Sequence, residues 1–160
     1  MIDLQHAGAG LQGYGLLAAQ LEALLADERD FIANASQFAA FLYHELPDLN
    51  WAGFYLNKQD QLVLGPFQGK VACVRIPFGK GVCGAAALTR STQRVEDVHA
   101  FPGHIACDSA SNSELVVPLL DGDRLIGVLD LDSPKTARFS AEDQAGIERL
   151  AEIFLRASDG

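Results

Sequence analysis

Hydrophobic residues recur at helical spacing in the first third of the chain and again near its end. Two helices are predicted in the first third, one over residues 16–25 and one over residues 31–46, and Pro47 ends the second. A closing helix is predicted over residues 141–155, with Ser140 as its N-cap in a capping-box arrangement. The residues at helical spacing are Leu16, Leu17, Leu21, Leu24 and Leu25 in the first helix and Ile147, Leu150, Ala151 and Phe154 in the closing helix. In the second helix we expect Phe38, Phe41, Leu42 and Leu46 to face the core.

The middle of the chain follows a strand pattern. Runs of aromatic and β-branched residues predict strands over residues 51–56, 61–67, 71–76, 95–98, 114–120 and 125–132. The turn at residues 121–123 joins the last two strands into a hairpin, and the Ala-rich residues 82–88 predict a short helix. Residues 99–112 form a long polar loop, of a length that is usually functional or disordered. This order predicts an α+β domain, in which a mainly antiparallel sheet is flanked by helices.

Composition and charge exclude several classes of protein. The 160 residues, with 49% hydrophobic residues, suit one domain with a single core, without repeats or an interdomain linker. The formal net charge of -9 predicts no nucleic-acid partner and no anionic membrane surface, since no basic stripe neutralises phosphates. No apolar run approaches the ~20 residues of a spanning helix. Residues 1–10 hold Asp3 and no Lys or Arg, so we expect no secretory signal and a cytoplasmic location.

The three cysteines are the first candidates for chemistry. In a reducing cytoplasm we expect them to be thiols, and their odd number argues against a closed disulfide framework. Cys107 lies in the polar loop, and Cys83 lies at the predicted start of the short helix, where a helix N-terminus favours the reactive thiolate. Cys73 alternates with Val71 and Arg75 on a predicted strand, which alone is typical of a core position.

Two carboxylates end the last predicted strand. Since every second residue of a strand faces the same side, Ile126, Val128, Asp130 and Asp132 share one face. If the hairpin pairs through its turn, Glu114 lies near Asp130 and Asp132. Three clustered carboxylates raise the pKa of at least one of them, which would then act as a proton donor near neutral pH. The pair also fits the simpler reading of a strand end that faces solvent.

Trp51 and Tyr55 are four residues apart and therefore share one face of the first predicted strand. A lone Trp favours a place in the core of the sheet. The functional alternative is an aromatic wall beside a small apolar group of a ligand.

Two further patterns resemble ligand sites but lack the necessary context. The glycines of residues 79–84 match the spacing of a dinucleotide fingerprint, but hairpins surround them instead of βαβ units. His99, His104 and Cys107, with Cys83 as a fourth ligand, suggest zinc, yet they match none of the tight ligand pairs that define such sites. We therefore predict neither a nucleotide nor a metal.

Several runs, in order along the chain, resemble free methionine-(R)-sulfoxide reductases, which are single GAF-type domains. The runs are residues 50–56, 64–73, 75–77, 79–84, 96–99, 103–108, 111–114 and 127–133. The likeness extends from about residue 30 to residue 155, whereas the Gly-rich residues 7–15 do not align. We therefore divide the chain into an N-terminal arm at residues 1–15 and a GAF-like catalytic domain at residues 16–160.

The resemblance implies an enzyme that reduces the free amino acid L-methionine (R)-S-oxide, without a metal or organic cofactor. It implies Cys107 as the attacking thiol and Cys73 as the resolving thiol, with Cys83 as a second candidate for resolving. The implied substrate-binding residues are the acids Glu114, Asp130 and Asp132 and the aromatic residues Trp51 and Tyr55. Thioredoxin is the implied reductant, and a homodimer is compatible with the sequence.

The chemistry of these residue types agrees with that implication. A carboxyl group with a raised pKa, such as Glu114, protonates the sulfoxide oxygen as a general acid. The Cys107 thiolate attacks the sulfur and becomes a sulfenic acid, which condenses with a second thiol to form a disulfide. Exchange with an external dithiol closes the cycle.

Two alternatives to the reductase stay open. One is a non-catalytic GAF sensor of a small molecule, although the Asn-Lys-x-Phe-Asp-Glu pattern of cyclic-nucleotide-binding members is absent. The other is a zinc-binding regulatory protein that uses His104 and the cysteines.

Overall fold

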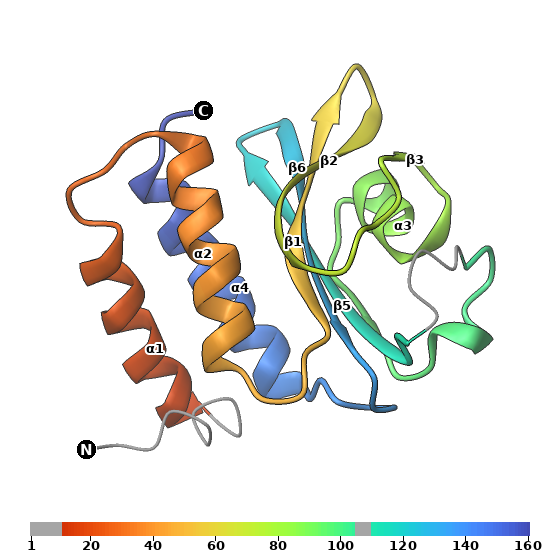
Figure 1. The fold of residues 1–160 in the computed structure, drawn as a ribbon. Coiled ribbons are helices and arrows are strands. Elements are labelled where there is room, and N and C mark those ends of the chain that lie inside the picture. The colour runs from red at the N-terminus through yellow and green to blue at the C-terminus, as the bar shows by residue number, and fades with distance from the viewer. Residues whose placement is uncertain (1–10, 105–109) are drawn as a thin grey trace.

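The computed structural model describes residues 11–104 and 110–160. A single antiparallel sheet of six strands, in the order β3-β2-β1-β6-β5-β4, forms the centre of the molecule (Figure 1). The strands are β1 (Trp51–Lys58), β2 (Gln61–Gly69), β3 (Arg75–Pro77), β4 (Gln93–Val95), β5 (Ser113–Asp121) and β6 (Arg124–Ser133). The helices are α1 (Leu11–Leu24), α2 (Phe31–Glu45), α3 (Gly81–Thr89), the 3-10 helix η2 (Val98–Ala100) and α4 (Ala141–Ala157). The α+β class and the antiparallel sheet are therefore confirmed.

The helices cover the two faces of the sheet unequally. The helices α1, α2 and α4 lie on one face, and α3 lies on the other (Figure 1). The larger core fills the first interface, where the rings of Phe38, Phe54 and Phe154 pack together. A smaller core lies under α3 and includes Trp51 and Tyr55. In the part of the chain that the structure describes, no helix has the length and apolar character needed to cross a bilayer.

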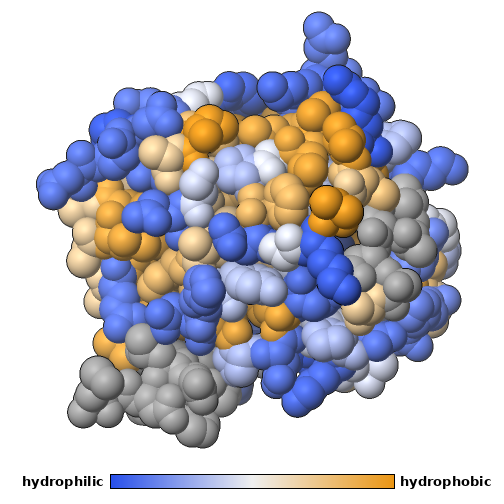
Figure 2. Space-filling model, in the orientation of Figure 1, coloured by the Kyte–Doolittle hydropathy of each residue, from blue (hydrophilic) through white to orange (hydrophobic). Residues whose placement is uncertain are grey.

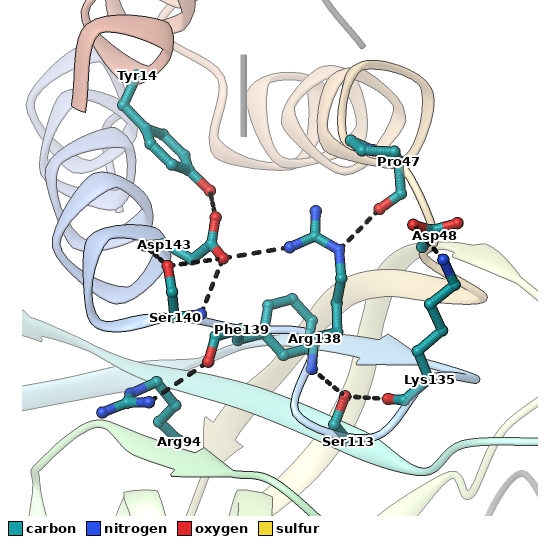
Figure 3. A network of polar contacts seen from close by, with 10 residues as sticks. All are labelled: Tyr14, Pro47, Asp48, Arg94, Ser113, Lys135, Arg138, Phe139, Ser140 and Asp143. Atoms are coloured by element: carbon teal, nitrogen blue, oxygen red, sulfur yellow. Dashed lines mark hydrogen bonds and ion pairs between the residues drawn. The ribbon is translucent and has the colours of Figure 1, made fainter. Parts of the chain in front are cut away.

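The first helix is tied to the last by buried polar groups (Figure 3). The predicted capping box is confirmed, since the Asp143 amide donates to Ser140 Oγ and the Ser140 amide donates to the Asp143 carboxylate. The hydroxyl of Tyr14, on α1, donates to Asp143 Oδ1 at 2.7 Å, and Arg138 Nη1 lies 3.2 Å from Asp143 Oδ2. Helix α1 begins at Leu11, so it extends into the segment assigned to the arm and does not begin at the expected residue 16.

The strand predicted over residues 71–76 is wrong for its first four residues. Only Arg75–Pro77 pairs with β2. Three hydrogen bonds hold the preceding backbone instead. Trp51 Nε1 donates to the Lys70 carbonyl, Tyr55 Oη donates to the Cys73 carbonyl, and the Leu64 amide donates to the Val74 carbonyl. A hydrophobic alternation cannot reveal such side-chain anchors. The strand predicted over residues 95–98 lies earlier, as β4, and Val98 begins the 3-10 helix η2.

An irregularity in the β5–β6 hairpin corrects another expectation. Leu119 pairs with Gly127 and Leu120 with Leu125, which leaves Ile126 as an extra residue between the two pairs. The bulge reverses the alternation of side chains at that point. Ile126 consequently packs against the core under α1, α2 and α4, and Leu125 lies with Val128 in the core under α3. The shared face of Val128, Asp130 and Asp132 is confirmed.

Candidate active site

A cavity lies on the face of the sheet that α3 covers. It has about 520 Å³ of empty space, which includes the solvent at its mouth. Its lining contains every substrate-binding residue expected from the sequence, together with Cys83: Trp51, Tyr55, Cys83, Glu114, Asp130 and Asp132. Cys107, the expected nucleophile, lies outside the described residues.

The three carboxyl groups come together because the hairpin pairs as predicted. Glu114 lies opposite Asp132 in the β5–β6 ladder, and Asp130 lies opposite Gly53 on β1. All three are at most 9% exposed. Burial raises the pKa of Glu114, and the charge of Asp130 raises it further. Burial also raises the pKa of Asp130, with a further increase from the charge of Asp132. The site therefore holds protonated acid at a pH where exposed carboxyl groups are ionised.

One oxygen of Asp130 is available to a ligand. Asp130 Oδ1 is buried and accepts no hydrogen bond from the residues that the structure describes. Buried carboxylate oxygens normally have partners. Because Asp130 also lines the cavity, a bound ammonium or hydroxyl group can supply the missing donor.

The two aromatic residues form both the core and a wall of the cavity. Their ring centroids lie 5.8 Å apart with an angle of 20° between the planes, and the Phe67 ring also stacks on Trp51, with a centroid distance of 5.1 Å. Both residues are 2% exposed. Burial raises the pKa of Tyr55, and the neighbouring Asp130 raises it further, so the hydroxyl stays a neutral donor. Trp51 and Tyr55 thus belong both to the smaller core and to the wall of the cavity.

Cys83 differs from the expectation for its position at a helix N-terminus. Its side chain is 4% exposed, and Sγ lies 3.8 Å from Glu114 Oε2. Burial raises the pKa of the thiol well above its ordinary value, and the charges of Asp130, Glu114 and Asp132 raise it further. Loss of solvent and nearby negative charge outweigh the helix dipole, which contributes only about 0.3–1 kcal/mol at a typical exposed site. The expected thiolate is therefore wrong for Cys83.

The expectation that all three cysteines are thiols is wrong for Cys73. It is disulfide-bonded, and it lies partly buried in the segment between β2 and β3. Its carbonyl accepts the hydrogen bond from Tyr55 Oη at 2.9 Å, which fixes this segment against the aromatic wall. Among the described cysteines, only Cys83 is a free thiol.

The residues considered as alternative zinc ligands do not form one group among the described residues. Among residues 11–104 and 110–160, one group could hold a metal ion, with ligand atoms within 4.8 Å of one another: Cys83, Glu114 and Asp130. His99 is outside this group, and its Nε2 is hydrogen-bonded to Asn112 Oδ1 at 3.0 Å. His104 lines the cavity instead, and burial lowers its pKa.

Other cavity residues were not assigned to the substrate from the sequence. They include Ala72, Ile76, Lys80, His104 and Ser111. Ser111 Oγ accepts a hydrogen bond from Asn50 Nδ2 at 3.2 Å, which joins the start of β1 to the loop before β5. His104 and Ser111 lie in runs that carry the family resemblance, so those runs were the available signal.

Comparisons with known proteins agree with this geometry. Residues 26–157 match the family described as the GAF domain. The chain is 56% identical to the free methionine-R-sulfoxide reductase of Escherichia coli (strain K12), with 86% of this chain and 83% of that protein covered. A solved free methionine-R-sulfoxide reductase from Neisseria meningitidis, in complex with its substrate, superposes with a TM-score of 0.88 at 46% identity, covering 92% and 89% of the two chains. A protein from Burkholderia vietnamiensis, described as a candidate GAF sensor, superposes with the same TM-score at 60% identity, covering 91% and 92%.

Proposed function

Because the chain belongs to the GAF-domain free methionine-R-sulfoxide reductases, and is thus an oxidoreductase, we propose that it reduces free L-methionine (R)-S-oxide with cysteine thiols that thioredoxin recycles. The observation that carries this proposal is a cavity that combines three buried carboxyl groups, an aromatic wall and a nearby cysteine in a disulfide.

The cavity offers a complementary group for each part of the substrate. Asp130 and Asp132 face the ammonium group of a free amino acid, whose positive charge lowers the pKa of Asp130 from its raised value in the empty site. Asp130 Oδ1 can accept a hydrogen bond from that ammonium group. The stacked rings of Trp51 and Tyr55 accommodate the S-methyl end. A methionine sulfoxide within a protein lacks the free ammonium group, so the carboxylates favour the free amino acid.

Glu114 is the proton donor in this proposal. A sulfoxide oxygen is a poor leaving group until it is protonated, and a carboxyl group with a raised pKa carries that proton near neutral pH. Cys107 then attacks the sulfur and takes the oxygen as a sulfenic acid, and methionine is released. The sulfur of the substrate gains the two electrons that the thiol loses.

Cys73 is the resolving thiol in this proposal. Its thiol condenses with the sulfenic acid, water leaves, and a disulfide forms. The disulfide-bonded state of Cys73 and the buried, neutral thiol of Cys83 both favour Cys73 over Cys83 for this step. Thioredoxin then returns two electrons and two protons by thiol–disulfide exchange. A homodimer and a cytoplasmic location stay predictions.

The test offers each methionine sulfoxide epimer, free and within a peptide, to the purified protein with a thioredoxin system. We expect methionine to form only from the free R epimer. Consumption of the peptide-bound or S form would contradict the proposed substrate. Binding of the free amino acid without turnover would instead indicate a sensor.

A further inference from the structure

Two exposed apolar side chains flank the disulfide-bonded cysteine. Val71 is 88% exposed and Val74 is 61% exposed, on either side of Cys73 in the sequence. The other large exposed hydrophobic side chains of the described residues belong to separate helices and to the end of β5: Leu24, Ile32, Leu88 and Leu120. Single exposed apolar residues are ordinary, but two beside a redox-active sulfur point to a contact surface.

The backbone of this segment is anchored, so the exposure of the two valines is built into the fold. The Lys70 carbonyl accepts a hydrogen bond from Trp51 Nε1, and the Cys73 carbonyl accepts one from Tyr55 Oη. The Val74 carbonyl accepts a third from the Leu64 amide at 2.8 Å. The segment runs along the front of the sheet, between β2 and β3 (Figure 1), and apolar groups gather among hydrophilic ones on this side of the molecule (Figure 2).

The part of the chain around this segment is positively charged, although the protein as a whole is acidic. Residues 61–95 contain five Lys or Arg and no Asp or Glu, although the chain has a net charge of -9. Lys70, Arg75 and Lys80 are exposed. None of the three forms an ion pair with a carboxylate among the residues that the structure describes. Their charge is thus available to a partner.

We propose that residues 70–75, with Lys80, form the docking surface for the protein dithiol that reduces the Cys73 disulfide. The partner presents its reactive thiol among apolar and acidic residues. The apolar residues cover Val71 and Val74, and the acidic residues face the three cations. This inference rests on the proposed function for the presence of a protein reductant.

Docking at this surface brings the partner's reactive thiol to Cys73, so Cys73 Sγ is the sulfur that is attacked. A thiolate of the partner attacks Cys73 Sγ, a mixed disulfide forms, and the other cysteine of the original disulfide leaves as a thiolate that takes up a proton. The second thiol of the partner then attacks its own sulfur in the mixed disulfide, and Cys73 is released as a thiol. The partner loses two electrons and two protons and ends as a disulfide.

The experiment follows reduction of the disulfide by thioredoxin, as the probe partner, and by dithiothreitol, without any sulfoxide present. The double variant Val71→Ser/Val74→Ser should lose about tenfold in the second-order rate constant with thioredoxin, which corresponds to about 1.4 kcal/mol. Its rate with dithiothreitol should stay unchanged. Ile32→Ser, an exposed site on α2, is the matched control and should change neither rate.

Charge is tested separately. The double variant Lys70→Glu/Arg75→Glu should lower the rate at which thioredoxin reduces the disulfide, and this rate should depend less on salt concentration. The control Arg149→Glu, an exposed site on α4, should change neither the rate nor its salt dependence. A thioredoxin that lacks its second cysteine should be trapped on Cys73, as mass spectrometry of the mixed disulfide shows. Unchanged thioredoxin rates in both double variants, or trapping on another cysteine, would overturn the proposal. Since no sulfoxide is used, these results are independent of the proposed substrate.

Discussion

The thiol of Cys83 and the carboxyl group of Glu114 lie 3.8 Å apart, both buried, where α3 packs against β5. The charge of Glu114 raises the pKa of the Cys83 thiol, whereas the hydrogen bond from the thiol lowers the pKa of Glu114 by less than burial raises it. Burial acts in the same direction on both. The pair is thus held in its protonated form, which suits a proton donor and not a nucleophile.

Glu114→Gln should lower kcat by about 10²–10⁴, the range typical of general acid catalysis, and leave substrate binding largely intact. The wild-type kcat should fall as pH rises through the raised pKa of Glu114, because the donor proton is lost there. The variant lacks that acid and should show no such decline. Steady-state rates and calorimetric binding, measured from pH 5 to pH 9, check both parts.

Asp60→Asn provides the control for this experiment, since Asp60 is an exposed acid in the β1–β2 turn. Its rates and pH profile should match those of the wild type. If Glu114→Gln kept the wild-type kcat and the same decline with pH, Glu114 would have no part in the proton transfer.

Asp130→Asn should stabilise the fold at alkaline pH. Burial raises the pKa of Asp130 in the folded state, so the folded protein binds a proton that the unfolded chain releases. Stability contributed by such a group is present below the unfolded pKa and is lost as pH rises toward the folded pKa. The variant avoids that loss, so its gain in the free energy of unfolding should grow from pH 5 to pH 8. Urea denaturation at both pH values, in one redox state, measures it, and a gain independent of pH would contradict the argument.

The grouping of the acids was accessible from the sequence because it depends on local rules. The turn at residues 121–123 fixes the hairpin, and the alternation of a strand places Asp130 and Asp132 on one face, opposite Glu114. The same rules place Trp51 and Tyr55 together on β1.

Features that depend on tertiary burial were not accessible. The bulge at Ile126 leaves no mark in the hydrophobic pattern, and side chains distant in sequence hold residues 70–74 out of the strand. The helix dipole suggested a thiolate at Cys83, but the carboxyl groups that reverse this come from β5 and β6. The errors at residues 70–74 and at Cys83 arose where a contact distant in sequence overrode a local preference.

Tyr14→Phe should destabilise the protein, although Tyr14 lies in the segment assigned to the arm. Its hydroxyl donates to Asp143 in the buried network that starts α4, and a hydrogen bond to a charged group contributes about 1.5–3 kcal/mol (Figure 3). Tyr43→Phe on α2 is the matched control, since the Tyr43 hydroxyl forms no hydrogen bond with the residues that the structure describes, and it should change stability by less than about 0.5 kcal/mol. Equal free energies of unfolding for the two variants would show that α1 is not part of the cooperative fold.

Replacing each cysteine singly by serine should affect turnover with thioredoxin in three different ways. Cys107→Ser should abolish turnover, and Cys73→Ser should release about one equivalent of methionine and then stop, because the sulfenic acid has no thiol with which to condense. Cys83→Ser should keep multiple turnovers, since its buried thiol has a raised pKa and supplies little thiolate. Rapid-quench analysis of methionine, with mass spectrometry of the enzyme, measures the first turnover and the state of each sulfur. Sustained turnover by Cys73→Ser, together with loss of turnover by Cys83→Ser, would assign the resolving step to Cys83.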